Sequence, residues 1–142
     1  MERRGADDTA DRSARPEPAE GPVSAPDAVA DKAVRTFVDG GRLRSVPTRR
    51  RARAAVLMHL LTRFERGRDY PEREIDQILR TAHDDISTLR RELVDYRWLE
   101  RAGGIYRVAD EVPRRGPDEA QEVPADEAER LARVPRATGR LT

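Results

Sequence analysis

The sequence has no cysteine, a single lysine and only 4% aromatic residues, and these shortages narrow the classes of function that it can have. Without cysteine, disulfide bonds, thiolate metal sites and a cysteine nucleophile are excluded. The longest apolar run, residues 54–61, contains His59 and is far too short to cross a membrane. The N-terminal residues include no apolar segment of the kind found in signal peptides. The sequence therefore predicts a cytoplasmic protein without membrane contact.

Charged residues are abundant, and the positive ones are unevenly placed. They make up 39% of the 142 residues, yet the formal net charge is only +1. Residues 31–66 contain 10 basic and 3 acidic groups, so the positive charge is concentrated there. All basic residues except Lys32 are arginine, which is also what a GC-rich genome produces. We therefore expect one basic surface, formed by residues 31–66, on a protein that is close to neutral as a whole.

Both ends of the chain have the composition of disordered tails. Residues 1–27 are rich in Pro, Ala, Asp, Glu and Arg and contain almost no aliphatic side chain. Residues 111–142 are similar and are interrupted by four prolines, although residues 126–133 have the spacing of a short helix. Such segments bury too little apolar surface to offset the entropy cost of ordering. We therefore expect a disordered tail, a domain over residues 28–110, and a second tail that is disordered or partly helical.

The central region reads as three helices before the most informative stretch. A first helix capped by Asp27 or Asp31 is expected to stop at residues 39–41, where two glycines follow an aspartate. Thr48 is a plausible N-cap for the longest helix, which continues to about Phe64. A very short strand at residues 69–70 then precedes a helix that Pro71 opens and that runs through Leu79.

Residues 84–108 contain a helix followed directly by a hairpin. Ile86, Leu89 and Leu93 recur at helical spacing and form one apolar stripe. Residues 98–101 and 105–108 then read as two strands joined by a Gly-Gly turn. With the preceding elements this order predicts a mainly α fold with a small β-hairpin, namely a winged helix-turn-helix with disordered N- and C-terminal tails.

Four short motifs carry a resemblance to a known family. They are residues 37–43 (FVDGGRL), Val-Pro before the arginines at 46–51, YPERE at 70–74, and HDDISTLRRELVD at 83–95. The segment 37–108 resembles the bacterial domain family DUF2087. That family resembles winged helix proteins, and its domain occurs in some transcriptional regulators of the ArsR type. The resemblance therefore implies a winged-helix-like fold but no defined biochemical activity. The proline in the YPERE motif is a departure from the family pattern.

The arginines of the basic segment are candidates for phosphate contact. Guanidinium groups near the start of a helix form charge-assisted hydrogen bonds with phosphate oxygens. The same arginines are also compatible with an ordinary solvated surface. The candidates are Arg42, Arg44, Arg49, Arg50, Arg51 and Arg53.

The helix that begins near Asp84 occupies the recognition position of the predicted fold. Its exposed Ser87, Thr88 and Arg91 have the chemistry to reach base edges, and Arg91 can donate two hydrogen bonds to guanine. Asp84 and Asp85 oppose this interpretation, since carboxylates repel phosphate, and Arg90 and Arg91 can also pair with Glu92 or Asp95 along the helix. On the hairpin, the candidates for backbone contact are Arg101 and Arg107.

No catalytic or metal-binding constellation is evident. His83, Asp84 and Asp85 are adjacent but do not converge on one point, so we interpret them as a turn and a helix cap. No phosphate loop, hydrolase elbow or metal-ligand spacing occurs. We expect no cofactor, no metal and no enzymatic activity.

Two functions remain open at this point. The first is a non-catalytic, transcription-regulator-like protein that binds double-stranded DNA, either alone or as a homodimer. The alternative is a protein–protein interaction module that uses the same scaffold and presents the mixed-charge face of residues 84–95 to a partner.

Overall fold

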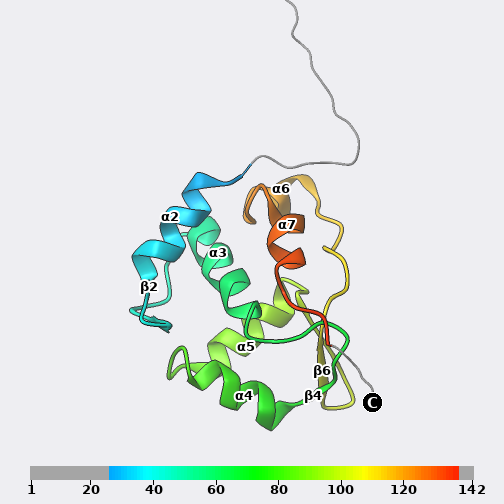
Figure 1. The fold of residues 1–142 in the computed structure, drawn as a ribbon. Coiled ribbons are helices and arrows are strands. Elements are labelled where there is room, and N and C mark those ends of the chain that lie inside the picture. Colours follow the sequence, from blue (N-terminus) through cyan, green and yellow to red (C-terminus); the bar gives the residue numbers. More distant parts are fainter. Residues whose placement is uncertain (1–25, 138–142) are drawn as a thin grey trace, which may run out of the picture.

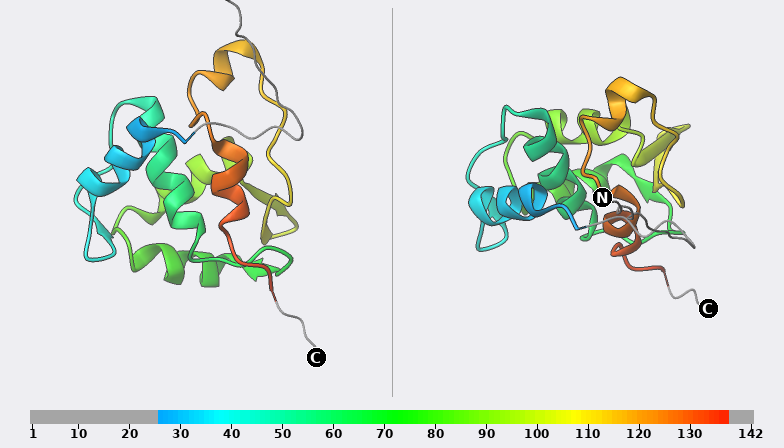
Figure 2. Two further views of the ribbon diagram at one scale, coloured as in Figure 1. Left: turned by 45° about the horizontal axis from the view of Figure 1, so that its top comes forward. Right: turned by 90° about the horizontal axis from the view of Figure 1, so that it is seen from above.

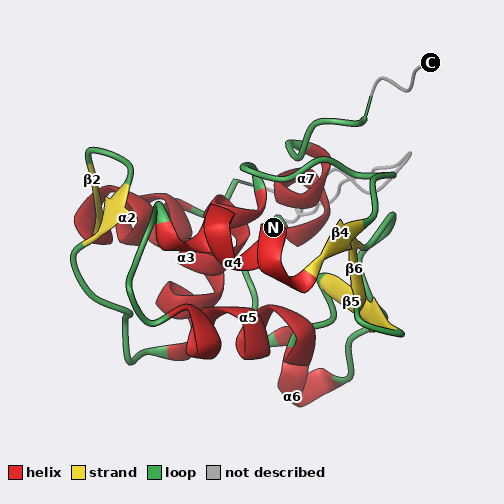
Figure 3. Cartoon of the chain, turned by 90° about the horizontal axis from the view of Figure 1, so that it is seen from below, coloured by secondary structure: helices red, strands yellow, loops and turns green. Residues whose placement is uncertain are grey.

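In the computed structural model, which describes residues 26–137, helix α3 (Arg50–Leu61) lies at the centre. Helices α2 (Ala28–Phe37) and α7 (Glu127–Ala132) flank it on opposite sides, as Figure 1 shows. Helices α4 (Glu72–Arg80) and α5 (Ile86–Asp95) pack below and behind it. The described residues form a small mixed α/β structure with six helices and two antiparallel sheets (Figures 2 and 3).

Helix α2 begins as the sequence predicts. Asp27 is its N-cap, and Oδ1 of that residue accepts a hydrogen bond from the Ala30 N–H at 3.0 Å. The helix ends where strand β2 (Val38–Asp39) begins, and β2 pairs with β3 (Arg42–Leu43). The intervening Gly40 and Gly41 have φ angles of 60° and 82°, which side chains disfavour.

Helix α3 starts slightly later than predicted. Its N-cap is Arg49, which makes no side-chain capping hydrogen bond, so the prediction of Thr48 as the cap is wrong. From Ala54 on, most of the helix is buried, and α2 and α7 pack against it. Within the described residues it contributes the largest block of the core, comprising Ala54, Ala55, Val56, Leu57, Met58, Leu60 and Leu61.

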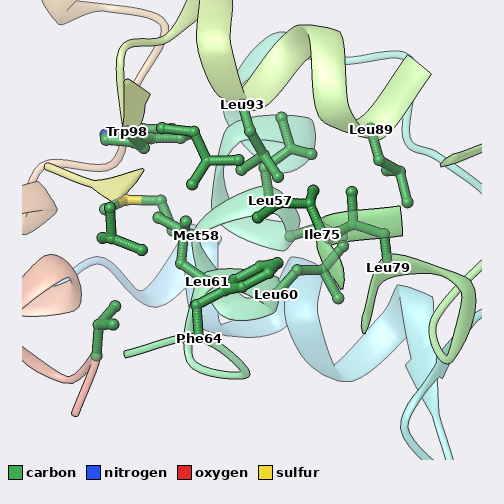
Figure 4. Packing of buried hydrophobic residues seen from close by; sticks show 14 of the residues in the cluster. Leu57, Met58, Leu60, Leu61, Phe64, Ile75, Leu79, Leu89, Leu93 and Trp98 are labelled. Atoms are coloured by element: carbon green, nitrogen blue, oxygen red, sulfur yellow. The ribbon is translucent and has the colours of Figure 1, made fainter. Parts of the chain in front are cut away.

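The core joins α3 to α4, α5 and the strands. Figure 4 shows Leu57 and Leu60 of α3 near Ile75 and Leu79 of α4 and near the two leucines of α5. The side chain of Leu60 has no solvent exposure. Truncating a fully buried leucine to alanine costs about 2–5 kcal/mol, so this contact set is a main source of stability.

A three-stranded sheet completes the central region. Strand β6 (Ile105–Val108) lies between β4 (Tyr70–Pro71) and β5 (Leu99–Ala102), with both pairings antiparallel. The turn between β5 and β6 uses Gly103 and Gly104 at φ angles of 58° and 81°. The predicted order of helix, short strand, helix, turn, helix, strand and strand is therefore confirmed from α3 to β6.

The C-terminal segment differs from the prediction. Residues 111–137 contain α6 (Pro117–Ala120) and α7, so the expected short helix is present, but the segment is packed rather than disordered. Val123, Leu131 and Val134 belong to the buried core. The composition concealed this, because the few apolar residues are separated by prolines and charges. The predicted N-terminal tail lies outside the described residues except for its last two positions.

Buried charges also hold this segment in place. Arg130 of α7 pairs with Asp126 at 2.6 Å and with Asp31 of α2 at 2.6 Å. Buried ion pairs are costly to form, but they are strongly destabilising to break from one side. Over residues 26–137, no helix is long and apolar enough to span a membrane.

Candidate nucleic-acid interface

The two faces of α5 are chemically distinct. Leu89 and Leu93 are buried against the core, which turns Ser87, Arg91 and Asp95 to the surface. The Asp85 carboxylate caps the helix by accepting from the Thr88 N–H at 3.3 Å. Thr88 itself is half-buried, so of the predicted base-reading residues Ser87 and Arg91 are the exposed ones.

A cavity of about 330 Å³ lies between α5, the start of α4 and the β5–β6 hairpin. We call it the α5 groove. It brings together Ser87, Arg91 and Arg101, three residues that the sequence singles out on two separate elements. Its lining is Glu72, Ser87, Arg90, Arg91, Val94, Asp95, Arg101 and Tyr106.

Tyr106 fixes the hairpin side of this groove. Its hydroxyl donates a hydrogen bond to the Glu72 carboxylate at 3.0 Å, linking β6 to the first residue of α4. Burial, followed by the hydrogen bond to Glu72, raises the pKa of Tyr106 above its usual 10.0, so the phenol keeps its proton at neutral pH. The Arg101 guanidinium carbon lies 5.7 Å from the centre of the Tyr106 ring, within cation–π range.

Arg90 fixes the helix side. Its guanidinium pairs with Asp76 of α4, with both side chains mostly buried, so the expected pairing of Arg90 within α5 is wrong. Within this ion pair, the Arg90 guanidinium and the Asp76 carboxylate neutralise each other beside the α5 groove. Among residues 26–137, Arg91 and Arg101 form no ion pair with a carboxylate of that range.

The arginines at the start of α3 lie elsewhere, beside α2 and α6. We call Arg49, Arg50, Arg51 and Arg53 the α3 cluster. Arg50 pairs with Glu122 at 2.8 Å and Arg51 with Asp27 at 2.6 Å. Arg53 lies 3.2 Å from Glu92 of α5, although the angle is too poor for a hydrogen bond and its buried Nε is left unsatisfied. Arg49 is exposed at the helix start.

Three other predicted arginines also face carboxylates. Arg42 contacts Asp84 at 3.3 Å, and the distance from Arg44 to Asp39 is 3.4 Å. On the hairpin, both Nε and a terminal nitrogen of Arg107 donate to Asp69, at 2.9 and 2.6 Å. These pairs are solvent-exposed, and exposed pairs contribute only about 0.2–1 kcal/mol each. The structure therefore does not gather all the predicted arginines on one surface.

Comparison with family models identifies the central segment. Residues 42–108 match the model described as "Uncharacterized protein conserved in bacteria (DUF2087)". This segment is a DUF2087 domain. Comparisons with curated proteins and with solved structures found no match.

The DUF2087 domain contains the whole α5 groove but not the carboxylates that pair with Arg50 and Arg51 of the α3 cluster. Asp27 precedes the matched segment and Glu122 follows it. Two flanking pieces of chain thus meet at the start of α3. The Asp27 carboxylate also accepts from the Ala125 N–H at 2.9 Å, which ties the two flanks together directly.

The HDD motif of the DUF2087 domain has the structural role that the sequence predicts. His83 Nδ1 accepts a hydrogen bond from the Asp85 N–H at 3.0 Å, and the Asp85 side chain caps α5. Among the residues that the structure describes, no group of three or more His, Cys, Asp or Glu side chains is placed to hold a metal ion.

Sequence reasoning missed the residues that position the groove. Glu72 and Asp76 are four apart on α4 and therefore lie on one helix face, where each meets a residue of the neighbouring elements. The sequence signal that could have identified them is the four-residue spacing of these two acidic residues on α4. Their partners, Tyr106 and Arg90, could not be assigned without the packing of the hairpin and α5 against α4.

Proposed function

We propose that this protein binds double-stranded DNA through the α5 groove, without catalysis, as a transcription-regulator-like factor. The elements from α3 to β6 have the order and pairing expected of a winged helix-turn-helix, with α5 as the recognition helix and the β5–β6 hairpin as the wing. Such a role implies a cytoplasmic location. It requires neither a cofactor nor a metal.

One observation carries the proposal. Arg91 on α5 and Arg101 on the hairpin share one groove and have no carboxylate partner within residues 26–137, whereas neighbouring Arg90 is neutralised by Asp76. A guanidinium on an exposed helix face can donate two hydrogen bonds to guanine, and one on a hairpin can reach a phosphate. Ser87 supplies a hydroxyl beside them.

The proposal uses fewer arginines than the sequence suggests. Arg107 is held by Asp69, and Arg50 and Arg51 are held by carboxylates from the flanks. Of the candidate arginines without a carboxylate partner in residues 26–137, only Arg91 and Arg101 line the α5 groove. The number of phosphate contacts there is therefore small, and the affinity should be modest at physiological salt. The specific sequence bound is a matter for selection experiments.

A protein-interaction role is the second candidate, because the acidic residues around α5 favour it. The Asp84 side chain is 92% exposed, and Asp85 and Asp95 are also at the surface. These carboxylates would repel DNA and would attract a basic partner. A homodimer remains a prediction; the exposed large apolar side chains in the described range are Val29 and Ile105, on separate elements.

The test is duplex DNA binding by the full chain and by the double variant Arg91→Ala/Arg101→Ala. Arg107→Ala is the matched control, since that arginine lies on the same hairpin but pairs with Asp69. We expect the double variant to lose about tenfold or more in affinity, and the control to lose much less. Equal losses in both variants, or no loss in either, would reject the α5 groove as the DNA site.

A further inference from the structure

Two arginines of the α3 cluster, Arg50 and Arg51, pair with carboxylates outside the DUF2087 domain, and these two carboxylates differ in burial. The Asp27 side chain that holds Arg51 is 5% exposed and also caps α2, so it is a structural part of the fold. The Glu122 side chain that holds Arg50 is 32% exposed, and Arg50 itself is 65% exposed. The second contact is therefore a surface pair that a competing anion can reach.

A cavity of about 530 Å³ lies where the α3 cluster faces α6. Arg49, Arg50 and Arg51 line it from one side, and Asp118 and Glu122 line it from the other. We call Asp118, on α6, and Glu122, two residues beyond the end of that helix, the α6 acidic pair. The arrangement places two carboxylates next to three guanidinium groups, where the phosphates of a polyanion would otherwise lie.

The α6 acidic pair is held there by contacts of its own element. Glu119, between the two, pairs with Arg97 at 2.9 Å and with Arg115 at 3.0 Å. Helix α6 has only four residues and buries none of them. Since the anchor is Glu119 and the core contact is Val123, neutralising Asp118 and Glu122 should not disturb packing.

We propose that the α6 acidic pair is an autoinhibitory contact that withholds the α3 cluster from polyanions such as the DNA backbone. Glu122 competes with phosphate for Arg50, the guanidinium that it contacts, and Asp118 adds a second negative charge to the cavity that Arg49 and Arg50 line. Both members of the pair lie outside the DUF2087 domain, so the inhibition is a property of the flank added to that domain. The choice of DNA as the polyanion rests on the proposed function, but the α3 cluster is a separate surface from the α5 groove.

The test compares duplex DNA binding by the full chain and by Asp118→Asn/Glu122→Gln over a range of salt concentrations. We expect the variant to bind about two- to tenfold more tightly at low salt, with a salt slope steeper by about one unit for each additional phosphate that it neutralises. The matched control is Glu65→Gln/Glu129→Gln, which changes the net charge equally at positions that line neither this cavity nor the α5 groove. An equal increase in affinity in the control, or no increase in the variant, would overturn the proposal.

A further pair of substitutions separates this proposal from the α5 groove. Adding Arg49→Gln/Arg50→Gln to the neutralised variant should abolish the increase in affinity, because the released guanidinium groups are gone. Adding Arg91→Ala/Arg101→Ala should weaken DNA binding with and without the Asp118→Asn/Glu122→Gln substitutions, and the ratio of the two affinities should stay the same. If the α5 substitutions have no effect in any background while the increase persists, the proposed function of the groove fails and the autoinhibitory contact stands.

An increase that survives the α3 substitutions rejects the autoinhibitory contact. Thermal unfolding of each variant checks that the fold is kept.

Discussion

The Trp98 indole N–H donates a hydrogen bond to the Glu127 carboxylate at 2.8 Å, joining the residue before β5 to the first residue of α7. Trp98 has no solvent exposure, and Glu127 is 7% exposed. Arg115 pairs with the same carboxylate at 2.6 Å. The C-terminal segment therefore adds to the core of the DUF2087 domain and satisfies the buried indole N–H of Trp98.

Replacement of Glu127 by alanine should be strongly destabilising. The change leaves the Trp98 indole nitrogen and the buried Arg115 guanidinium without this partner, so we expect a loss of about 3 kcal/mol in the free energy of unfolding. Glu129→Ala on the same helix is exposed and should change stability by less than about 0.5 kcal/mol. Urea denaturation measures both, and similar values for the two variants would contradict this account.

Truncation after residue 110 tests whether the C-terminal segment belongs to the folding unit. The fragment 1–110 keeps Asp27 but lacks Val123, Leu131 and Val134, all of which are buried in the core of the full chain. We expect it to unfold at a lower temperature and with lower cooperativity, because apolar core surface becomes exposed. A calorimetric transition with the midpoint and enthalpy of the full chain would show that the segment is dispensable.

Stability should depend on the titration of His59 as the pH falls through 6.5. Burial, with the nearby Arg63 and Arg130, lowers the pKa of His59 below 6.5. As the pH falls through 6.5, the unfolded chain takes up the proton first, so the free energy of unfolding decreases until the folded-state pKa is reached. The variant His59→Gln should show a flatter profile in this window. Identical pH profiles for the two proteins would show that His59 titrates alike in both states.

Local sequence signals predict the helices and strands well where these do not depend on distant partners. The Gly-Gly turns, the Asp27 and Asp85 caps and the apolar stripe of α5 are all encoded within a few residues. The start of α3 is the exception, because Thr48 has the chemistry of a cap but does not act as one. There the arginine side chains and the flanking carboxylates, rather than a capping hydroxyl, surround the helix start.

The site is harder to predict, because charge pairing is a long-range property. A run of arginines looks like a phosphate clamp in the sequence, but Glu122 lies 72 positions from the Arg50 that it neutralises. Conversely, Arg91 and Arg101 do not stand out as a pair until the hairpin is packed beside α5. The sequence can identify candidate cations, but only the packing separates the paired ones from the available ones.

The most direct test of DNA binding is the affinity of the full chain for random-sequence duplex DNA at low and at physiological salt. The full chain is needed because residues beyond 110 contribute to the core. The account predicts measurable binding at low salt, with log K falling linearly against log salt by about 0.9 per phosphate contact. No binding at low salt, or binding that does not change with salt, would contradict it and would direct the search to protein partners.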